Sequence, residues 1–496
     1  MNRRNYSYDN LAKDFAKRET ELRRAYRNKD YVQTLSYLRF LSHLYWESNY
    51  KMTSDTVEEI TAKTAYQILG DTTIENADKH RVCFYDFFGL YDRGLAMIYL
   101  HALIGLGYYV DYIIYEFVPM QYKFQEIFGN NQSVCCKVIP RCGIVDRMRI
   151  LQKYLKESSA SSFFFYSVPD DVAGAGFFST IKGKCLRYLI DLTDHAYWLG
   201  KCAADYIVGF RNYGYNIALQ YRKIDSEKLL ILPFYPDSRE MYAFEGLPFD
   251  DRKRRFVFSG GSIYKIDGAT NNLYEEIVRH ILDQDSNMCF VYAGNGKSEI
   301  LDRIKQGYPD RFYQIDERKD LDALLQRAYI YLSTYPLGGG VLTQFACKNG
   351  CIPITFCDEP NGITDPKTYL INPDKVHFSF YRKEDLFSEI DKLIHDNQYY
   401  DEAKKNLKDL VITEEEFQEQ LQCILLRQRT KYQGIYESLN MTKFLDIYKK
   451  RFDYDRYSET ICKSRNKYLY KHYPLIFFKG VIKKWEGERK QSKLGE

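Results

Sequence analysis

Strands that end in glycine constrain this fold more than any other feature of the sequence. Three apolar, strand-like runs in the C-terminal half are each followed by a glycine-bearing turn and then by a helical pattern. The turns are Ser259-Gly260-Gly261, Ala293-Gly294-Asn295-Gly296 and Tyr335-Pro336-Leu337-Gly338-Gly339-Gly340. Repeated alternation of strand, glycine turn and helix predicts a parallel sheet with crossover helices, the doubly wound α/β architecture.

The N-terminal half repeats this alternation from residue 81 onward. Val82–Tyr85 is predicted as a strand, the apolar stripe from Leu95 to Leu106 as a helix, and Tyr109–Tyr115 as a second strand. The apolar stretch from Leu95 to Val110 is shorter than the about 20 residues that cross a membrane. A buried helix that leads into a strand is therefore favoured over a membrane span. Further strands are expected at Ser162–Ser167, Leu186–Asp191, Tyr206–Gly209 and Leu229–Leu232.

A run of charged residues, Asp250–Arg255, separates the two alternating series and predicts a domain boundary. Apolar residues at three-and-four spacing predict helices at 9–28, 31–48 and 53–69, ahead of the first series. The predicted regions are residues 1–79, an N-terminal helical segment; 80–250, a first Rossmann-like domain; 251–430, a second Rossmann-like domain; and 431–496, a basic helical tail.

Charge and composition exclude several classes of protein. The chain has 71 Lys and Arg against 67 Asp and Glu, and this net charge of +4 is too balanced for a nucleic-acid partner. With 45% hydrophobic residues the chain is neither disordered nor a small disulfide scaffold. No apolar segment follows Arg3-Arg4 as a secretory signal would require, and Cys83, Cys289 and Cys351 lie in apolar runs. We expect a cytoplasmic protein.

The C-terminal tail carries a concentrated positive charge. From Ile461 to Glu496 there are ten Lys and Arg and three acidic residues around the apolar Pro474–Phe478. Such a segment can dock on anionic lipid, which would place the protein peripherally at the inner face of the membrane. A solvated helix whose apolar stripe packs on the protein has the same pattern. Both interpretations remain open.

The glycine turns are suited to holding phosphate. In an open α/β sheet, ligands bind beyond the carboxyl ends of the strands, where bare backbone N–H groups and helix N-termini attract anions. Lys265 follows the first turn and can neutralise phosphate charge, while Thr343 begins the helix after the glycine triplet and can donate its hydroxyl. No Lys-Ser/Thr pair follows at the spacing of a P-loop. A cleft for a diphosphate is therefore expected in the C-terminal half.

Two strand ends in the N-terminal half carry further candidates. The loop after the first strand contains Asp92, Arg93 and Gly94, where the arginine can bind an anion and the glycine permits close approach. Another strand end places His195 beside Asp194. A neutral imidazole held by a carboxylate can act as a general base near pH 7. A structural histidine that caps the next helix is the alternative.

Taken together, these motifs resemble the GT-B glycosyltransferases, in particular those of bacterial capsule and exopolysaccharide clusters. The resemblance covers residues 80–430, and Tyr329–Phe356 is similar to the donor-binding stretch of that superfamily. It implies that the C-terminal domain holds a nucleotide-sugar, expected to be a UDP-sugar, and that the N-terminal domain holds a glycan or lipid-linked acceptor. It also implies that neither a cofactor nor a metal ion is required.

The resemblance assigns roles to individual residues of this chain. Arg318 would lie near the nucleotide base. The diphosphate would be lined by the glycine turns and two side chains, namely Gly260, Gly261, Lys265, Gly294, Gly338, Gly339, Gly340 and Thr343. On the acceptor side, His195 would be the catalytic base with Asp194 beside it, and Arg93 would anchor phosphate or acceptor.

One departure from the family pattern bears on mechanism. Leu337 and Phe345 stand where many retaining members carry two glutamates eight residues apart. Without these carboxylates an inverting displacement is favoured, in which a base deprotonates the acceptor hydroxyl while the diphosphate leaves. Two alternatives stay open. One is a non-catalytic GT-B-shaped partner of a transferase, and the other is a sugar-nucleotide 2-epimerase, which would need carboxylates and a histidine clustered at the sugar.

Overall fold

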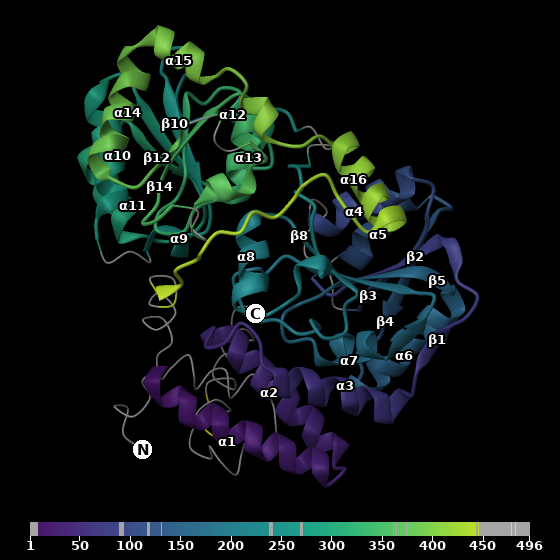
Figure 1. The fold of residues 1–496 in the computed structure, drawn as a ribbon. Helices are drawn as coiled ribbons and strands as arrows, with labels where there is room; N and C mark the ends of the chain where they lie inside the picture. Colours follow the sequence, from purple (N-terminus) through teal and green to yellow (C-terminus); the bar gives the residue numbers. More distant parts are fainter. Residues whose placement is uncertain are drawn as a thin grey trace, which may run out of the picture. The chain divides into compact units, whose positions relative to one another are not determined.

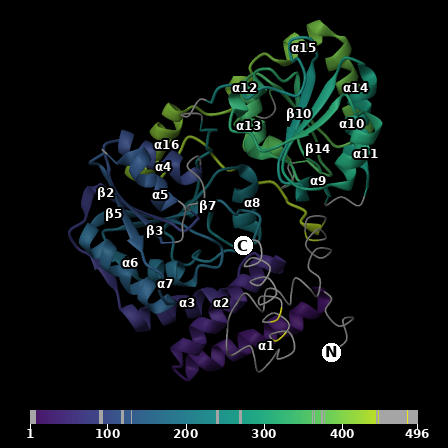
Figure 2. The ribbon, with the colours of Figure 1, turned by 180° about the vertical axis from the view of Figure 1, so that it is seen from behind.

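The computed structural model divides the chain into two compact units. It describes residues 8–442, apart from 89–93, 117–119, 130, 238–241, 268–270, 361, 363–364, 373–374 and 376, and beyond 442 only Leu445, Phe478 and Ile482. Unit 1 holds the described residues up to Gly209, Gly214–Ile231 and those from Leu421 onward. Unit 2 holds Phe210–Tyr213 and Leu232–Gln420. Each unit contains its own parallel sheet flanked by helices (Figures 1 and 2).

Unit 2 is built on a six-stranded sheet in the order β12-β11-β10-β13-β14-β15, with every pairing parallel. Every residue of β10, β11 and β13 is buried, as expected for strands that are covered by helices on both faces. The strands are β10 (Phe256–Gly260), β11 (Cys289–Ala293), β12 (Phe312–Ile315), β13 (Ile330–Leu332), β14 (Ile352–Phe356) and β15 (Ser379–Phe380).

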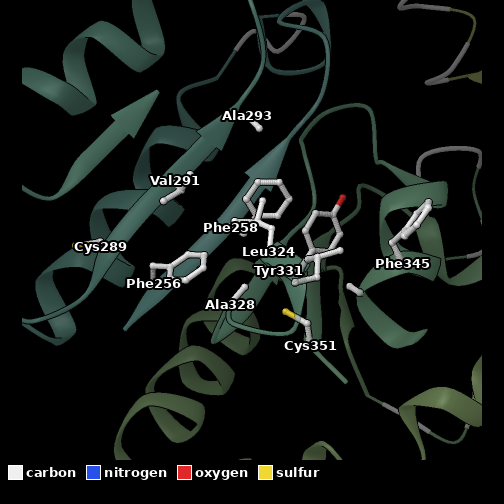
Figure 3. Packing of buried hydrophobic residues seen from close by; sticks show 12 residues of the cluster. Phe256, Phe258, Cys289, Val291, Ala293, Leu324, Ala328, Tyr331, Phe345 and Cys351 are labelled. Carbon is white, nitrogen blue, oxygen red and sulfur yellow. The ribbon is translucent and has the colours of Figure 1, made fainter. Parts of the chain in front are cut away.

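Helices alternate with these strands. The apolar stripe of α10, which includes Ile277 and Ile281, is buried, while Glu276 and Asp283 are exposed. The helices are α9 (Tyr264–Asp267), α10 (Leu273–Gln284), α11 (Glu299–Gly307), α12 (Leu321–Leu325), α13 (Gly340–Lys348), η3 (Pro366–Tyr369), α14 (Lys383–His395), α15 (Asn397–Ala403) and η5 (Leu407–Leu410). Figure 3 shows Phe258, Val291 and Tyr331 of the sheet meeting Leu324 of α12 and Phe345 of α13 in one apolar cluster.

Unit 1 contains a seven-stranded parallel sheet in the order β4-β3-β2-β5-β7-β8-β9 and a separate parallel pair, β1 with β6. The strands are β1 (Thr72–Ile74), β2 (Asp78–Asp86), β3 (Tyr109–Tyr115), β4 (Val134–Ile139), β5 (Ala160–Tyr166), β6 (Ile181–Gly183), β7 (Leu186–Asp191), β8 (Tyr206–Gly209) and β9 (Leu229–Ile231).

An aromatic ladder crosses the centre of this sheet. Phe84, Phe164, Tyr188 and Tyr206 stand in register on four neighbouring strands. Successive rings stack with centroids 5.9, 4.9 and 5.7 Å apart. Stacked aromatic pairs contribute about 0.5–1.5 kcal/mol beyond the area that they bury. Part of the high Tyr and Phe content of the sequence therefore lies in the core of unit 1.

The predicted N-terminal helices are present and belong to unit 1. Ser54 caps the third of them by accepting a hydrogen bond from the Val57 N–H. This helix packs closely on α7, where a Cβ added to Gly176 would lie 3.2 Å from the Ala65 side chain. The α-helices that lie wholly in unit 1 are α1 (Tyr8–Arg27), α2 (Tyr31–Ser48), α3 (Asp55–Leu69), α4 (Leu95–Gly105), α5 (Met120–Phe128), α6 (Ile144–Ser158) and α7 (Val172–Thr180). Two more, α8 (Asn212–Gln220) and α16 (Glu414–Arg427), begin in unit 2 and continue in unit 1.

The domain boundaries differ from the predicted ones. The predicted boundary at residue 250 lies inside unit 2, because Phe244, Leu247 and Phe249 pack against the apolar cluster of that unit. Residues 1–79 do not stand apart from the first Rossmann-like domain, since α3 packs on α7. The chain also returns to unit 1 at Leu421, where the Tyr188 hydroxyl donates to the Ile424 carbonyl oxygen.

Two further expectations concern a possible membrane span and the basic C-terminal tail. No helix among the described residues is long and apolar enough to cross a membrane, and the stretch from Leu95 to Val110 is α4 followed by the start of β3, as predicted. The basic tail, residues 461–496, lies outside the described residues except for Phe478 and Ile482. Its two interpretations stay as they were.

Candidate functional site

The order of strands in unit 2 defines where a ligand crevice can form. The chain runs from β10 outward to β11 and β12, then returns to the other side of β10 to form β13. The loops that leave β10 and β13 therefore diverge at a topological switch point, the position at which open α/β sheets bind ligands. These two loops carry the predicted glycine turns. We call residues 259–265 and 333–340 the glycine ledge.

The two loops of the ledge are in direct contact. The Leu337 N–H donates to the Lys265 carbonyl oxygen at 3.3 Å. The end of β11 joins them, because the Gly261 N–H donates to the Ala293 carbonyl oxygen at 2.9 Å. Lys265 and the glycine triplet thus share one edge of the sheet, as the sequence predicts.

Lys265 carries a charge that no other described residue compensates. Its side chain is half-buried, and among the described residues its ammonium has no hydrogen bond, ion pair or aromatic partner. Burial lowers the pKa of Lys265, because desolvation disfavours the charged form. A desolvated cation beside bare backbone is stabilised by an anion, so this position suits a phosphate group.

At several glycines of the ledge, and at Gly294 after β11, backbone conformation or packing within the protein disfavours a side chain. Gly261 has φ +139°, which other residues rarely adopt, and Lys265 packs against it with Cδ 3.4 Å from where a Cβ would stand. A Cβ on Gly294 would lie 2.4 Å from the Gly261 carbonyl oxygen, and one on Gly340 would lie 2.4 Å from the Tyr369 ring. The protein itself therefore needs glycine at these positions, whether or not a ligand approaches.

Gly260 and Gly339 follow the same rule. A Cβ on Gly260 would meet the Ala293 carbonyl oxygen at 3.0 Å, and one on Gly339 would meet the Tyr331 hydroxyl at 2.8 Å. Gly338 lies in the same loop, one residue before Gly339. Their predicted contact with phosphate stays a prediction.

Two of the predicted donor-side side chains are committed to contacts within unit 2. Thr343 is buried in the first turn of α13, where its hydroxyl donates to the Gly339 carbonyl oxygen at 3.0 Å. Arg318 forms a paired contact with Asp320 at 2.7 and 2.6 Å and donates to the Gly246 carbonyl oxygen. The hydrogen bonds that Arg318 donates to the Asp320 carboxylate are the main reason that the pKa of Arg318 is raised. In this structure Arg318 fastens the segment before β10.

In unit 1 the structure brings His195 and Asp194 together as predicted. His195 Nδ1 lies 3.3 Å from Asp194 Oδ1, and the histidine side chain is 35% exposed, whereas the aspartate is buried. The loop is fixed from behind by the buried Arg222, which donates to the carbonyl oxygens of Asp194 at 3.0 Å and Ala196 at 2.6 Å. In a neutral imidazole whose Nδ1–H donates to a carboxylate, the lone pair that can take up a proton is on Nε2.

The second predicted element of unit 1 is only partly described. Asp92 and Arg93 lie outside the described residues, and Gly94 is the residue before the first turn of α4. Its φ of −76° is available to any residue, so its backbone conformation does not require glycine.

Sequence reasoning missed a buried charge pair at the switch point of unit 1, which lies between β2 and β5. Arg147 Nη2 lies 2.8 Å from Asp171 Oδ1, and the other oxygen of Asp171 accepts hydrogen bonds from Tyr85 at 2.9 Å and Ser167 at 2.8 Å. Arg147 follows β4, a strand that the sequence did not reveal. A predicted strand at Val134–Ile139 would have been the signal that places Arg147 at this edge.

Comparison with known proteins identifies the fold. No family model matches the chain, and no curated protein matches it in sequence. A putative UDP-N-acetylglucosamine 2-epimerase from Listeria monocytogenes is similar in structure, with 10% identity and a TM-score of 0.51 over 73% of this chain and 100% of that one. A glycosyltransferase from Rickettsia africae is similar with 11% identity and a TM-score of 0.51, over 71% of this chain and 99% of that one. The predicted fold class, two Rossmann-like domains of GT-B type, is confirmed.

Proposed function

We propose that this chain transfers a sugar from a nucleotide-sugar, a UDP-sugar in the first instance, to a glycan or lipid-linked acceptor. The reaction would be an inverting displacement that requires no metal ion. The observation that carries this proposal is the Lys265 ammonium on the glycine ledge at the switch point of unit 2, which has no partner in the part of the chain that the structure describes. The GT-B fold supports it, because solved structures with this fold include a glycosyltransferase.

In this proposal unit 2 handles the charge of the leaving group. The bond between the anomeric carbon and the phosphate oxygen breaks, and the nucleoside diphosphate leaves with the electron pair. The Lys265 ammonium stabilises the negative charge that develops on the diphosphate. A charge placed in advance in a half-desolvated position is worth more than the same charge in water, and it needs no reorganisation during the reaction.

Unit 1 supplies the base in the same proposal. The acceptor hydroxyl oxygen bonds to the anomeric carbon on the face opposite the diphosphate, and its proton passes to Nε2 of His195. Asp194 keeps Nδ1 protonated and stabilises the imidazolium that forms. Because His195 is partly exposed while Asp194 is buried, the histidine can reach an acceptor and the aspartate serves only to orient it.

A calorimetric screen of the full-length protein tests the proposal. UDP-, GDP- and CDP-sugars are titrated in turn, and any that bind are incubated with candidate acceptors while nucleotide release is followed. We expect saturable binding of one nucleotide class and acceptor-dependent release of its diphosphate. If no nucleotide-sugar binds, the proposal is wrong. Binding without turnover would instead support a non-catalytic partner of a transferase.

A sugar-nucleotide 2-epimerase is the second candidate, because the putative epimerase from Listeria monocytogenes matches the chain with the same TM-score as the glycosyltransferase. The glycine ledge contains neither histidine nor carboxylate, whereas this reaction would need such groups at the sugar. Incubation with the bound UDP-sugar alone in deuterated water distinguishes the two. An epimerase exchanges the proton at C2 without any acceptor, and a transferase does not.

We also propose capsule or exopolysaccharide assembly on the cytoplasmic side of the membrane as the setting of this reaction. The support is the resemblance of residues 80–430 to transferases of such clusters and the basic segment after Ile461, which suits anionic lipid. Flotation of the full-length protein with vesicles of anionic lipid, against vesicles of neutral lipid, tests the membrane contact.

A further inference from the structure

The segment that follows α16 lies as an extended strap on α8, and both belong to unit 1 from Gly214 and Leu421 onward (Figures 1 and 2). Between residues 428 and 441 it forms neither helix nor strand. Half-buried and exposed residues alternate along it, with one shift of phase: Tyr432, Gly434, Glu437 and Leu439 are half-buried, and the residues between them, including both Ile435 and Tyr436, are exposed. Such an alternation is typical of an extended chain with one edge against a surface.

Asn216 holds the first part of the strap through both ends of its side-chain amide. Its Nδ2 donates to the Ile435 carbonyl oxygen at 2.9 Å, and its Oδ1 accepts from the Glu437 N–H at 2.9 Å. Asn216 is fully buried. Its amide would lose both of these contacts if the strap left, and such a loss is costly for a buried polar group.

Gln220 repeats this arrangement one helical turn further along. Its Nε2 donates to the Glu437 carbonyl oxygen at 2.6 Å, and its Oε1 accepts from the Leu439 N–H at 3.1 Å. The Tyr221 hydroxyl then donates to the Leu439 carbonyl oxygen at 2.9 Å. Five backbone groups of residues 435, 437 and 439 are therefore paired with side chains of α8 and of Tyr221, the residue that follows it.

The spacing explains why this arrangement works. Residues four apart on a helix are displaced by about 6 Å along its axis, and residues two apart on an extended chain by about 6.5 Å. Asn216 and Gln220 therefore meet equivalent backbone groups of the strap, much as a neighbouring strand would. On the side of the strap, all five of these contacts are made by backbone atoms.

Two side chains beside the paired backbone groups face solvent. Those of Ile435 and Tyr436 are each 68% exposed. The structure imposes one requirement, at Gly434, where a Cβ would lie 2.5 Å from ring atoms of Tyr215. An occupant of this face thus needs an extended backbone and a glycine before the paired residues.

We propose that the face formed by Tyr215, Asn216 and Gln220 of α8, together with Tyr221 just after it, is a peptide-binding site. Its ligand is an extended, glycine-containing peptide that is recognised through its backbone, and residues 434–439 occupy the site in cis. A free peptide of the same sequence makes the same contacts and competes with the tethered segment for the site. This competition is set mainly by the effective concentration of the tethered segment, about millimolar for a short connection. This site is independent of the sugar-transfer proposal.

A fluorescent peptide of residues 430–442 tests the proposal on the full-length chain. The double variant E437P/L439P removes the two N–H donors of the tethered strap and leaves α8 unchanged. We expect the peptide to bind this variant at least about tenfold more tightly than the wild type, because the cis occupant is weakened. Adding N216A/Q220A to the same variant should weaken binding by more than about tenfold. G434V, which clashes with Tyr215, vacates the site independently of proline.

Two altered peptides separate backbone recognition from side-chain recognition. E437A keeps the backbone N–H and should bind like the natural peptide, whereas E437P lacks that N–H and should bind at least about tenfold more weakly. The proposal is overturned if neither strap-weakened chain binds the peptide while both keep the circular dichroism of the wild type. Binding that is insensitive to N216A/Q220A, or equal for the E437A and E437P peptides, would also overturn it.

Discussion

The two sheets of this protein have the same strand order around their switch points, but the cations at these points differ in their partners. In unit 1 the cation at the switch point, Arg147, is paired with Asp171 at 2.8 Å. Burial acts to lower the pKa of Arg147, but the charge of Asp171 raises it overall. In unit 2 burial alone acts on Lys265, and its pKa is lowered. The same topology therefore carries a cation paired with a carboxylate in unit 1. In unit 2 it carries a lysine that has no anionic partner among the described residues.

This difference distinguishes a charge that stabilises the fold, that of Arg147, from a charge that is suited to bind an anionic ligand, that of Lys265. A buried pair that is already satisfied gains nothing from an external phosphate, whereas a desolvated ammonium does. In the reaction that we propose, the anionic part of the substrate binds in unit 2 and His195 in unit 1 takes the proton. Each of these roles can be removed without removing the other.

The largest expected effect is on turnover, from H195A in unit 1. Loss of a general base should lower the rate of sugar transfer by about 10²–10⁴-fold, while affinity for the nucleotide stays unchanged because the donor charge is handled in unit 2. Initial rates and calorimetry on the same preparation give both numbers. Asp194→Asn is the companion variant and should retain more activity than H195A. Transfer at the wild-type rate by H195A would remove this residue as the base.

The next effect is on stability and sharpens the comparison of the two cations. D171A leaves Arg147 buried without its partner and should cost about 3–5 kcal/mol of unfolding free energy. K265M removes a desolvated charge that has no partner among the described residues, so it should change stability by less than about 1 kcal/mol or raise it. Chemical denaturation followed by circular dichroism measures both. Equal losses for D171A and K265M would contradict the contrast drawn between the two switch points.

A smaller effect, on the pH dependence of stability, comes from a buried carboxylate that accepts hydrogen bonds from backbone N–H groups and forms no ion pair among the described residues. Glu58 on α3 accepts hydrogen bonds from the N–H groups of Gly200 at 2.9 Å and Lys201 at 3.3 Å, yet burial raises its pKa to about 7. Between its unfolded pKa and about pH 7 the folded protein keeps a proton that the unfolded chain has released. Stability should therefore fall as pH rises through this window and level off above it.

E58Q removes this titration while keeping an oxygen acceptor for the Gly200 N–H. Relative to wild type, the variant should gain up to about 3 kcal/mol on going from about pH 5 to about pH 8. Thermal unfolding across this range measures the difference, and E59Q, on the exposed side of the same helix, is the matched control. A difference between E58Q and wild type that does not change with pH would show that Glu58 does not titrate in this window.

Local patterns of the sequence were sufficient to predict the strands that are buried and bounded by glycine. β10, β11 and β13 of unit 2 are continuous apolar runs, and each ends within a few residues of the glycine-bearing turn that the sequence shows after it. β4 could not be recognised, because it lies at the edge of its sheet and Lys137 interrupts its apolar character. The domain boundary was misplaced because Phe244 and Phe249 show their partners only in three dimensions.

The candidate site was predictable where it depends on adjacent residues and not where it depends on distant ones. His195 and Asp194 are neighbours in sequence, and their contact is present. The pairing of Arg147 with Asp171 joins two separate loops, so no local pattern reveals it. Gly340 was interpreted as a phosphate contact, but the nearness of Tyr369, which also requires glycine there, follows only from tertiary packing.

The affinity of nucleoside diphosphate for wild type and K265A tests the central contrast most directly. Isothermal titration with the diphosphate that binds best, at fixed salt, should show that K265A binds about 10–100-fold more weakly, the loss expected for one charge-assisted contact to phosphate. K305A, an exposed lysine of α11 in the same unit, should bind like wild type. Equal affinity of K265A and wild type would contradict the assignment of the substrate anion to the glycine ledge.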